Sequence, residues 1–439
     1  MLRHRDRRAV VTAQTVGGDA PIEDPGDHLR LMVIGGGLLL FINFAAPMNG
    51  IIAIPIAFFL KNRLHLAAHQ LAIFNLWVGI PLFASFLFGL LRDRWSPFGA
   101  GDRGHIIVFG LATMAVYAAV AFMNPTYGIL LASLLVATSA FQIVASASSG
   151  LLTVIGQREA VAGGMSAVFG VANAVPALVA FLIGGYLSGL LEGRSAGAAA
   201  QILFLVASGL MAAIAIFGAI GPRALFQRGA AQAHSLTLWA DIGRLMRHWP
   251  VWPVMMIQAL WQFAPAMGIV LQYHITNTLH ATDAQWGEWN AIFYGVFTPV
   301  YLLYGVLCRR FRLNGLLWFG FVIAVGQMAP LLFVHSAVGA LWAAAAMGLL
   351  GALGQAALVD LAIRSAPRGL QGTMIMMFTA IYWGSQRFGD LFGTEIYDHH
   401  GGFIPAVWWT IGVYALILPL LLLVPRRLTA TRDGEAVPV

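Results

Sequence analysis

The stretch FGLLRDRWSPFGAGDRG, residues 88–104, places five charged side chains between two apolar runs. They are Arg92, Asp93, Arg94, Asp102 and Arg103. Only 10% of the whole chain is charged, so this density is unusual for the sequence. The same stretch is rich in glycine and contains a proline, and these residues favour turns. It therefore indicates a charged loop between two apolar helices.

The composition of the chain sets the class of protein. The 439 residues are 59% hydrophobic, and the mean hydropathy is +0.79. A soluble domain cannot cover so much apolar surface, whereas a lipid bilayer solvates it. The single cysteine, Cys308, excludes an internal disulfide. The net charge of +7 is spread over the segments between apolar runs, so it indicates membrane topology rather than nucleic-acid binding.

Apolar stretches long enough to cross a bilayer as helices, at about 20 residues each, recur along the whole chain. We place about twelve spans near 31–59, 66–91, 105–122, 126–153, 161–190, 200–220, 250–276, 288–308, 314–333, 337–363, 370–396 and 403–424. Residues 1–30 are polar and lack the apolar stretch of a signal peptide, which predicts a disordered cytoplasmic tail. The predicted protein is all-α and membrane-integral, with six-helix halves at 31–220 and 250–424. A cytoplasmic linker at 221–249 joins them, and residues 425–439 form a second cytoplasmic tail.

The arginines give the orientation. The even-numbered connections carry most of them, whereas the odd-numbered connections carry only Lys61, Arg63 and Arg194 together with several acids. Cytoplasmic loops have an excess of basic residues. Both termini and the loop at 88–104 are therefore expected in the cytoplasm.

An internal repeat links the two predicted halves. The segment GLLRDRWSPFG, which begins at Gly89, matches GVLCRRFRLNG, which begins at Gly305. Farther along, AVAGGMSAVFG at 160–170 matches GLQGTMIMMFT at 369–379, pairing Gly163 with Gly372. Spans two to five thus echo spans eight to eleven in the same orientation. This predicts parallel repeats related by an axis along the membrane normal.

The charged loop resembles the signature of the major facilitator superfamily, which runs Gly, spacer, Asp-Arg, Gly and then Arg-rich residues between spans two and three. The matching residues are Gly89, Asp93, Arg94, Gly99 and Arg103. The resemblance implies a transporter that works by alternating access. A glycine lets helices approach closely, and an acid at a helix end can pair with an arginine or a helix N-terminus of the other half only while that side is closed. The alternative is a solvated loop that only sets topology.

Two stretches are similar to the folate–biopterin transporter branch of that superfamily. One is DRWSPFG in the loop, and the other is residues 364–398. The branch carries the pattern Cys-Pro-x-Gly-x-Glu-x-Thr after span ten, and the positions here are Ala366, Pro367, Gly369, Gln371 and Thr373. Ala366 and Gln371 depart from the pattern. A second resemblance, through overall layout, is to the light-harvesting-complex assembly proteins of the same superfamily.

Charged residues inside the predicted spans are functional candidates, because a charge in hydrocarbon is costly. Arg387 and Asp390 share one face of span eleven. They either bind an anionic solute or exchange a proton, or else they form a structural pair within the helix. Asp360 lies one turn before Arg364 near the cytoplasmic end of span ten. It either stabilises a gate or forms an ordinary pair within the helix.

Uncharged polar and aromatic residues mark candidate inward faces of several spans. Amide side chains in hydrocarbon seek hydrogen bonds, either to neighbouring helices or to a solute. As a set drawn from spans one, four, seven and eleven, they fit a cavity between the halves, where aromatic rings can stack on a flat ligand. These candidates are Asn43, Gln142, Gln258, Trp261, Gln262 and Tyr382.

The sequence lacks a Walker loop and the usual metal-ligand spacings, so we predict neither an enzyme nor a cofactor. The prediction is a secondary transporter in the cytoplasmic (inner) membrane, monomeric and surrounded by lipid. It would move a small organic solute, such as a pterin- or folate-like anion, using a proton or sodium gradient. The alternative is a non-transporting assembly factor that binds a pigment or a partner membrane protein.

Overall fold

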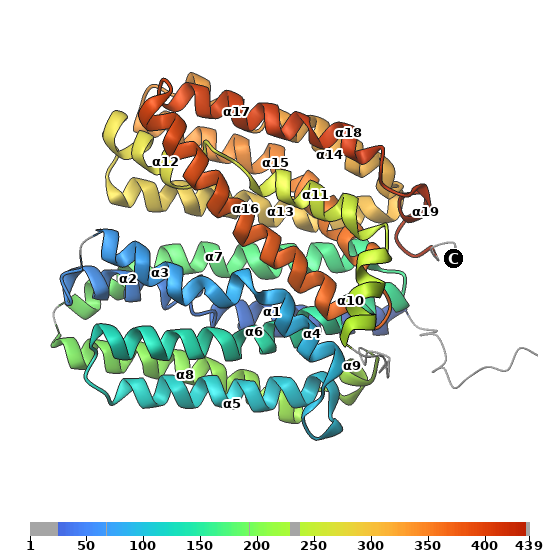
Figure 1. The fold of residues 1–439 in the computed structure, drawn as a ribbon, viewed down its shortest axis with the longest axis horizontal. Coiled ribbons are helices and arrows are strands. Elements are labelled where there is room, and N and C mark those ends of the chain that lie inside the picture. The colour runs from blue at the N-terminus through green and yellow to red at the C-terminus, as the bar shows by residue number, and fades with distance from the viewer. Residues whose placement is uncertain (1–24, 67, 193, 229–237, 436–439) are drawn as a thin grey trace, which may run out of the picture.

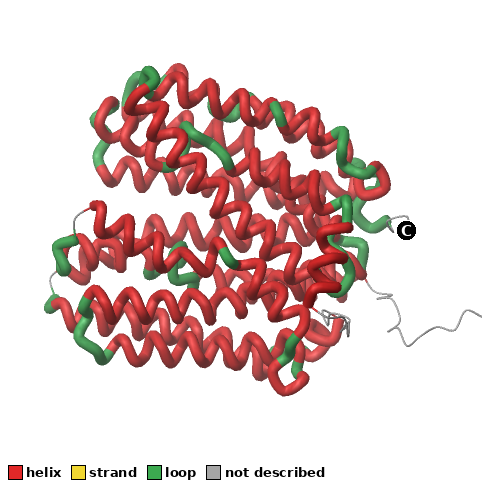
Figure 2. Tube along the Cα trace, in the orientation of Figure 1, coloured by secondary structure: helices red, strands yellow, loops and turns green. Residues whose placement is uncertain are grey.

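The computed structural model describes residues 25–66, 68–192, 194–228 and 238–435 (Figure 1). Within these ranges every regular element is a helix, and the connections gather at the two ends of a bundle (Figure 2). The predicted all-helical class is confirmed. Residues 1–24 of the predicted N-terminal tail lie outside the described residues, whereas residues 25–30 already belong to the first helix.

The first half of the chain supplies eight helices, two of its spans being interrupted. They are α1 (Pro25–Phe44), α2 (Ala53–Asn62), α3 (Ala68–Phe83), α4 (Ser85–Arg94), α5 (Gly101–Ala121), α6 (Tyr127–Arg158), α7 (Ala162–Glu192) and α8 (Ala196–Ile220). The predicted linker then contains α9 (Arg223–Arg228) and α10 (Leu238–Arg247).

The second half repeats this order. Its helices are α11 (Val251–Gln262), α12 (Ile269–Tyr273), α13 (Asp283–Arg310), α14 (Leu313–Val325), α15 (Ala337–Ser365), α16 (Gln371–His399), α17 (Phe403–Ala415) and α18 (Ile417–Leu421). A short α19 (Arg426–Thr429) lies in the predicted C-terminal tail, which packs against the bundle. We call the end that contains connections 95–100, 159–161, 311–312 and 366–370 the arginine-rich end; α10 and α19 lie there too (Figure 1).

Four long helices begin with a hydroxyl cap at the end opposite the arginine-rich end. The side chains of Thr126, Ser195, Thr282 and Ser336 each accept a hydrogen bond from a backbone N–H of the first turn. Such caps satisfy backbone donors that a helix leaves unpaired at its start. They fix where α6, α8, α13 and α15 begin.

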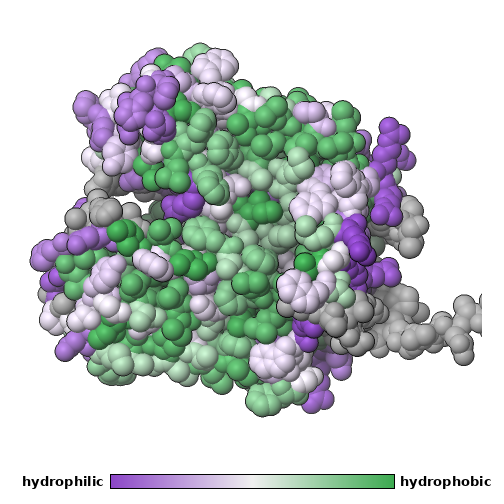
Figure 3. All heavy atoms as spheres, in the orientation of Figure 1, coloured by the Kyte–Doolittle hydropathy of each residue, from purple (hydrophilic) through white to green (hydrophobic). Residues whose placement is uncertain are grey.

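Nine helical segments among the described residues are long and apolar enough to cross a membrane. The three remaining predicted spans depart from this pattern for visible reasons. Residues 45–52 separate α1 from α2, residues 263–268 separate α11 from α12, and α16 carries several charged residues. Apolar side chains cover the middle of the surface and hydrophilic ones gather at its two ends (Figure 3).

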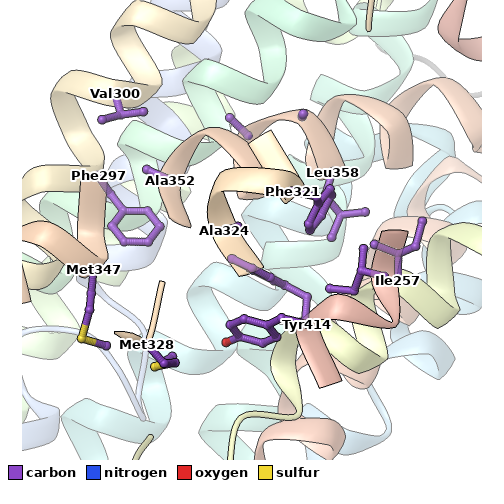
Figure 4. Close-up of a cluster of buried hydrophobic side chains, with 14 of the residues drawn as sticks. Ile257, Phe297, Val300, Phe321, Ala324, Met328, Met347, Ala352, Leu358 and Tyr414 are labelled. Carbon is purple, nitrogen blue, oxygen red and sulfur yellow. The ribbon is translucent and has the colours of Figure 1, made fainter. Parts of the chain in front are cut away.

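Each half has its own apolar core. One core joins buried residues from α1 to α9 with Ile363 of α15, and the other joins residues from α10 to α19 with Ala174 of α7 (Figure 4). Phe321, Met347 and Tyr414 belong to the second core, where helices of that half interdigitate. Two separate cores allow the halves to move as rigid bodies, because neither half depends on the other to bury most of its apolar side chains.

Packing between the halves follows the repeat seen in the sequence. Helix α4 packs against α16, and its counterpart α13 packs against α7. These two pairs carry the matched glycine segments, around Gly89 with Gly372 and around Gly305 with Gly163. A hypothetical Cβ on Gly305 would lie 3.3 Å from the Cβ of Ala167 on α7. The repeated sequence is therefore the surface on which the halves meet.

Candidate functional site

Hydrogen bonds between the two halves, in the described part of the chain, gather toward the arginine-rich end. They occur at the ends of α4 and α16, between α6 and the α15–α16 connection, and at the start of α7. Ser85 and Ser166 add bonds to the carbonyls of Met376 and Ala356, within about three turns of that end. The structure is therefore closed at the arginine-rich end. At the opposite end the surface is hollowed between the halves (Figure 3).

Asp93 makes the contact between halves that the signature predicts. Its Oδ1 accepts a hydrogen bond from the backbone N–H of Gly372 at 3.2 Å, and its Oδ2 accepts from the N–H of Thr373 at 2.6 Å. The Thr373 hydroxyl donates a third bond at 2.8 Å. These donors form the first turn of α16, where the helix dipole also favours an anion. We call this contact of Asp93 with Gly372 and Thr373 the first latch.

Arg92 holds the Asp93 carboxylate in place. Its Nη1 lies 2.7 Å from Oδ1 of Asp93, while its Nε and Nη2 donate to the two oxygens of Asp102 at 2.6 and 2.5 Å. The guanidinium lies across Gly150 of α6, where a Cβ would fall 2.7 Å from its Cζ. All three charged side chains are buried, so the charge of Arg92 and those of the two aspartates compensate one another. From the sequence, Arg92 and Asp102 were expected only as loop charges, with no role of their own.

Gly89 brings the backbones of α4 and α16 into direct contact. A Cβ at this position would lie 2.6 Å from the carbonyl oxygen of Gly372 and 2.7 Å from the Cα of Thr373. No real side chain fits in that space. The glycine of the signature is therefore required by the close approach that places Asp93 on the helix terminus.

A glutamine pair adds a second contact that the sequence analysis missed. The Gln157 amide on α6 donates to the carbonyls of Ile363 and Ala366, at 2.8 and 2.7 Å. Gln371 in turn donates to Oε1 of Gln157 at 3.0 Å and accepts from the N–H of Gly369. Gln371 thus orders the connection that leads into α16. The sequence feature that could have predicted this contact was the position of Gln371, two residues before Thr373.

The other signature residues act within the first half or toward the linker. Arg94 pairs with Asp241 of α10 at 3.3 Å, so it joins α4 to the linker helix. Arg103 donates to the last carbonyls of α8, those of Gly218 and Ala219, instead of reaching the second half. A cation suits a helix C-terminus, which explains this placement. Gly99 adopts a φ of +68°, a conformation that few other residues accept, and turns the chain into α5.

Asp360 lies at a junction inside the second half. It is fully buried, and it accepts hydrogen bonds from Nε of Arg364 at 2.7 Å and from the hydroxyl of Tyr304 at 2.8 Å. A Cβ on Gly163 of α7 would lie 3.0 Å from its Oδ2. Asp360 thus forms the expected pair within α15 and also faces the first half.

Several residues that were predicted to contact the solute instead contact other parts of the protein. Asn43 donates to the Ala172 carbonyl and to Asn173, which ties α1 to α7. Gln142 donates to the Pro81 carbonyl at 3.4 Å, where α3 is interrupted. Trp261 is stacked on Tyr414 at 4.8 Å and meets Phe321 edge to face, inside the core of the second half. The apolar pattern placed these residues on inward faces but did not distinguish the core of a half from the space between halves.

The other residues that were predicted to contact the solute differ in how exposed their side chains are. Gln258 is fully buried, and both atoms of its amide lack a hydrogen-bond partner among the described residues. Gln262 is half-buried and donates to Gln355 at 3.5 Å. Tyr382 is half-buried and is hydrogen-bonded to Tyr294 on α13. Gln262 and Tyr382 therefore remain candidates for contact with a solute.

Arg387 and Asp390 lie on α16, about 24 Å from its start at the arginine-rich end. The Arg387 Nη1 is 3.5 Å from Asp390 Oδ2, and the Arg387 side chain is 47% exposed, against 9% for Asp390. Asp390 also accepts a hydrogen bond from the N–H of Ile269, at the start of α12. Asp390 is thus tied to the interruption of span seven, whereas the Arg387 side chain is about half exposed.

The two interrupted spans break at corresponding positions of the repeat. Pro47 and Gly50 in the first half match Pro265 and Gly268 in the second, at one offset. Gly268 has a φ of +58°. The break in α11–α12 begins about 18 Å from the arginine-rich end. Paired proline–glycine interruptions in the two halves of a transporter mark its binding region, because they free backbone groups for ligands. This signal lay in the sequence, as the Pro–Gly spacing that the two spans share.

A pocket of about 490 Å³ lies on α10, at the arginine-rich end (Figure 1). Arg244 and Arg247 make it electropositive, whereas burial lowers the pKa of His248, which adds no charge at neutral pH. The other lining residues are Trp239, Ala240 and Gly243. Among the described residues there is no group of three His, Cys, Asp or Glu side chains that suits a metal ion.

The helix order, the parallel repeat and the latch define a multi-pass membrane protein with the major facilitator fold. Transporters of known structure share this fold over nearly the whole chain. FucP, in its outward conformation, superposes with a TM-score of 0.67 at 17% identity, over 90% of this chain and 100% of FucP. The human organic anion transporter MFSD10 (TETRAN) gives 0.64 at 15% identity, over 91% and 100%.

A third structure is the proton:xylose symporter XylE, bound to 6-bromo-6-deoxy-D-glucose. It gives a TM-score of 0.67 at 13% identity, over 93% of this chain and 98% of XylE. No protein-family model matches the sequence, and no curated protein matches it. At these identities the likeness establishes the fold, and the solute has to be argued from the residues of this chain.

Proposed function

We propose that this protein is a secondary transporter that moves a small organic solute across the cytoplasmic membrane by alternating access. The observation that carries the proposal is the first latch. Asp93 of one half binds the first turn of α16 in the other half, and this contact has to break when the arginine-rich end opens. A membrane protein with two rigid halves and a breakable contact between them has the parts that alternating access needs.

The proposed orientation places the arginine-rich end, both termini and the linker in the cytoplasm. Its support is the excess of arginine in the connections at that end. In this orientation the conformation described above is closed to the cytoplasm and hollowed toward the outside. We further propose that the transporter acts as a monomer.

The proposed binding region is the layer that contains the interruptions of spans one and seven. Arg387 lies at this depth with its side chain about half exposed, and its charge favours an anionic solute. Gln262 and Tyr382 supply an amide and an aromatic ring that are not enclosed in a core. A flat heteroaromatic anion of the pterin or folate kind fits this chemistry. MFSD10, which has the same fold, is an organic anion transporter.

The proposed energy source is an ion gradient, with a proton or sodium ion as the coupled ion. Asp390 is the candidate coupling residue, because it is a buried carboxylate paired with the proposed solute-binding arginine. Its bond to the N–H of Ile269 supplies a mechanism. Protonation of Asp390 weakens its hold on both Arg387 and α12, and both lie at the proposed site.

The experiment that tests this function combines binding and flux. The purified protein is screened by thermal shift against pterins, folates, nucleosides, amino acids, sugars and pigments. Compounds that stabilise it are then offered to proteoliposomes under an imposed proton or sodium gradient. Accumulation that depends on the gradient is the expected result. Tight binding of a pigment or a partner protein without any flux would contradict transport and support the assembly-factor alternative.

A further inference from the structure

The C-terminal segment, residues 431–435, crosses the arginine-rich end and bonds to the first half. Asp433 Oδ1 accepts a hydrogen bond from the N–H of Gly163 at 2.8 Å, and its Oδ2 accepts from the N–H of Gly164 at 3.0 Å. These donors lie in the first turn of α7. The N–H of Gly434 also donates to the carbonyl of Ala160 at 2.7 Å. The end of the chain therefore caps a helix of the opposite half.

The same segment is held firmly by the second half. The Asp433 N–H donates to the Cys308 carbonyl at 3.0 Å, at the end of α13. Arg364 Nη1 donates to the Thr431 carbonyl at 3.1 Å and to its hydroxyl at 2.9 Å. Because Arg364 is also paired with Asp360, the segment is part of the buried polar junction of that half. It thus connects the two halves rather than lying on one.

This contact repeats the geometry of the first latch. Gly163 and Gly164 correspond to Gly372 and Thr373 in the internal repeat. Each pair of backbone N–H groups binds the two oxygens of one carboxylate, Asp93 in one case and Asp433 in the other. The sequence position in the second half that matches Asp93 is an arginine, Arg309. The second half therefore lacks a carboxylate at the position that matches Asp93, and Asp433 of the C-terminal segment supplies one instead.

The surrounding charges repeat as well. The first latch combines Arg92 with Asp93 and Asp102, and the C-terminal contact combines Arg364 with Asp360 and Asp433. Burial, followed by the charge of Asp360, raises the pKa of Asp433, and the N–H groups of Gly163 and Gly164 oppose that rise. Each site thus has one arginine and two carboxylates beside a helix N-terminus, although Arg92 contacts both of its acids whereas Arg364 contacts Asp360 and the neighbouring Thr431.

We infer that Asp433 is a second gate residue, and that residues 431–434 leave α7 whenever the arginine-rich end opens. We call the contact of Asp433 with Gly163 and Gly164 the second latch. The role of this latch in transport rests on the proposed function, whereas the contact and its effect on opening do not. The geometry requires release, because the segment bonds to α7 on one side and to α13 and α15 on the other.

Two measurements on the purified full-length protein test the inference without a solute. The first is the rate at which N-ethylmaleimide labels Cys308, the single cysteine, which is 1% exposed beneath the segment. The second is hydrogen–deuterium exchange of the Gly372 and Thr373 amides. These amides belong to the first latch, and Asp433 does not contact them. A role confined to holding the C-terminus in place leaves their exchange unchanged, whereas a gate role raises it.

The variants are Asp433→Asn, Asp433→Ala and the matched control Glu435→Gln. Asparagine keeps the shape of aspartate but turns an N–H₂ group toward a backbone N–H, so one of the two bonds is lost. Glu435 lies two residues away and accepts a bond only from within the segment, from the N–H of Arg432. The control therefore removes one negative charge from the same segment and leaves α7 capped.

We expect both Asp433 variants to raise the labelling and the exchange rates about tenfold, which corresponds to about 1.4 kcal/mol. Glu435→Gln is expected to behave as wild type. Faster labelling with unchanged exchange at Gly372 and Thr373 would overturn the gate role, as would wild-type values in both assays. Raised rates in a protein that moves no solute would uphold the second latch and contradict the proposed transport instead.

Discussion

Replacing Asp93 by asparagine tests the first latch directly. The substitution keeps the size of the side chain but removes its charge and one of its acceptors, so the bonds to Thr373 and to Arg92 cannot both persist. A hydrogen bond to a charged group contributes about 1.5–3 kcal/mol. Because that contact exists only while the arginine-rich end is closed, its loss lowers the ratio of closed to open molecules about 10- to 150-fold.

The shift can be measured by electron–electron double resonance between two spin labels at the arginine-rich end. Phe98 in the first half is 94% exposed and Arg310 in the second half is exposed, so cysteines there carry labels without disturbing the core. The native Cys308 is first replaced by serine. We expect a longer distance to gain population in Asp93→Asn and not in Glu288→Gln, which removes a carboxylate near the other end. An unchanged distance distribution at an unchanged melting temperature would refute the latch.

Three further predictions concern packing, solute and topology. Gly89→Ala places a Cβ 2.6 Å from a backbone oxygen of α16 and should cost about 1–3 kcal/mol, seen as a lower melting temperature. Gly79→Ala, with 3.7 Å to the nearest atom, is the control and should be neutral. Arg387→Lys should weaken solute affinity without lowering the melting temperature, since the planar fork is lost while the charge stays; full affinity in a stable Arg387→Ala protein would remove this residue from the site. Cysteines at Ser96 and Thr282 should react with an impermeant maleimide from opposite sides of the membrane, and reaction from one side would contradict the span count.

The fold could be predicted from the sequence because its signals are local. Apolar runs of about 20 residues locate the spans, and Ser or Thr caps locate several of their starts. The interruptions of spans one and seven were harder to predict, because an apolar run continues through them. Their signal was the spacing shared by Pro47–Gly50 and Pro265–Gly268, which becomes visible only when the halves are aligned.

The candidate site could be predicted only where a residue type already implies its partner. Asp93 was found because its loop resembles the major facilitator signature, and an acid at a helix end can pair with an arginine or a helix N-terminus of the other half. Trp261 was predicted to face the cavity. Helical spacing shows which side of a helix a residue lies on, but not what packs against that side. In the structure Tyr414 packs there. Asp433 lies 270 residues from its partner Gly163, in a segment whose polarity predicted only a tail. Contacts of that range depend on packing between whole halves, which no local pattern records.

The presence of two matched latches bears on how the gate can operate. Moving a two-state equilibrium from 1:99 to 99:1 takes about 5.5 kcal/mol. A single hydrogen bond to a charged group contributes about 1.5–3 kcal/mol and falls short of that, whereas the several bonds of the two latches together reach it. In the proposed opening motion α4 leaves α16 and α7 leaves α13 together, so both contributions enter one equilibrium. In the first latch the carboxylate is Asp93 of α4, one of the two paired helices. In the second latch it is Asp433, which lies in the C-terminal segment 431–435. Closure of the arginine-rich end therefore depends on a segment that can be displaced without unfolding any span.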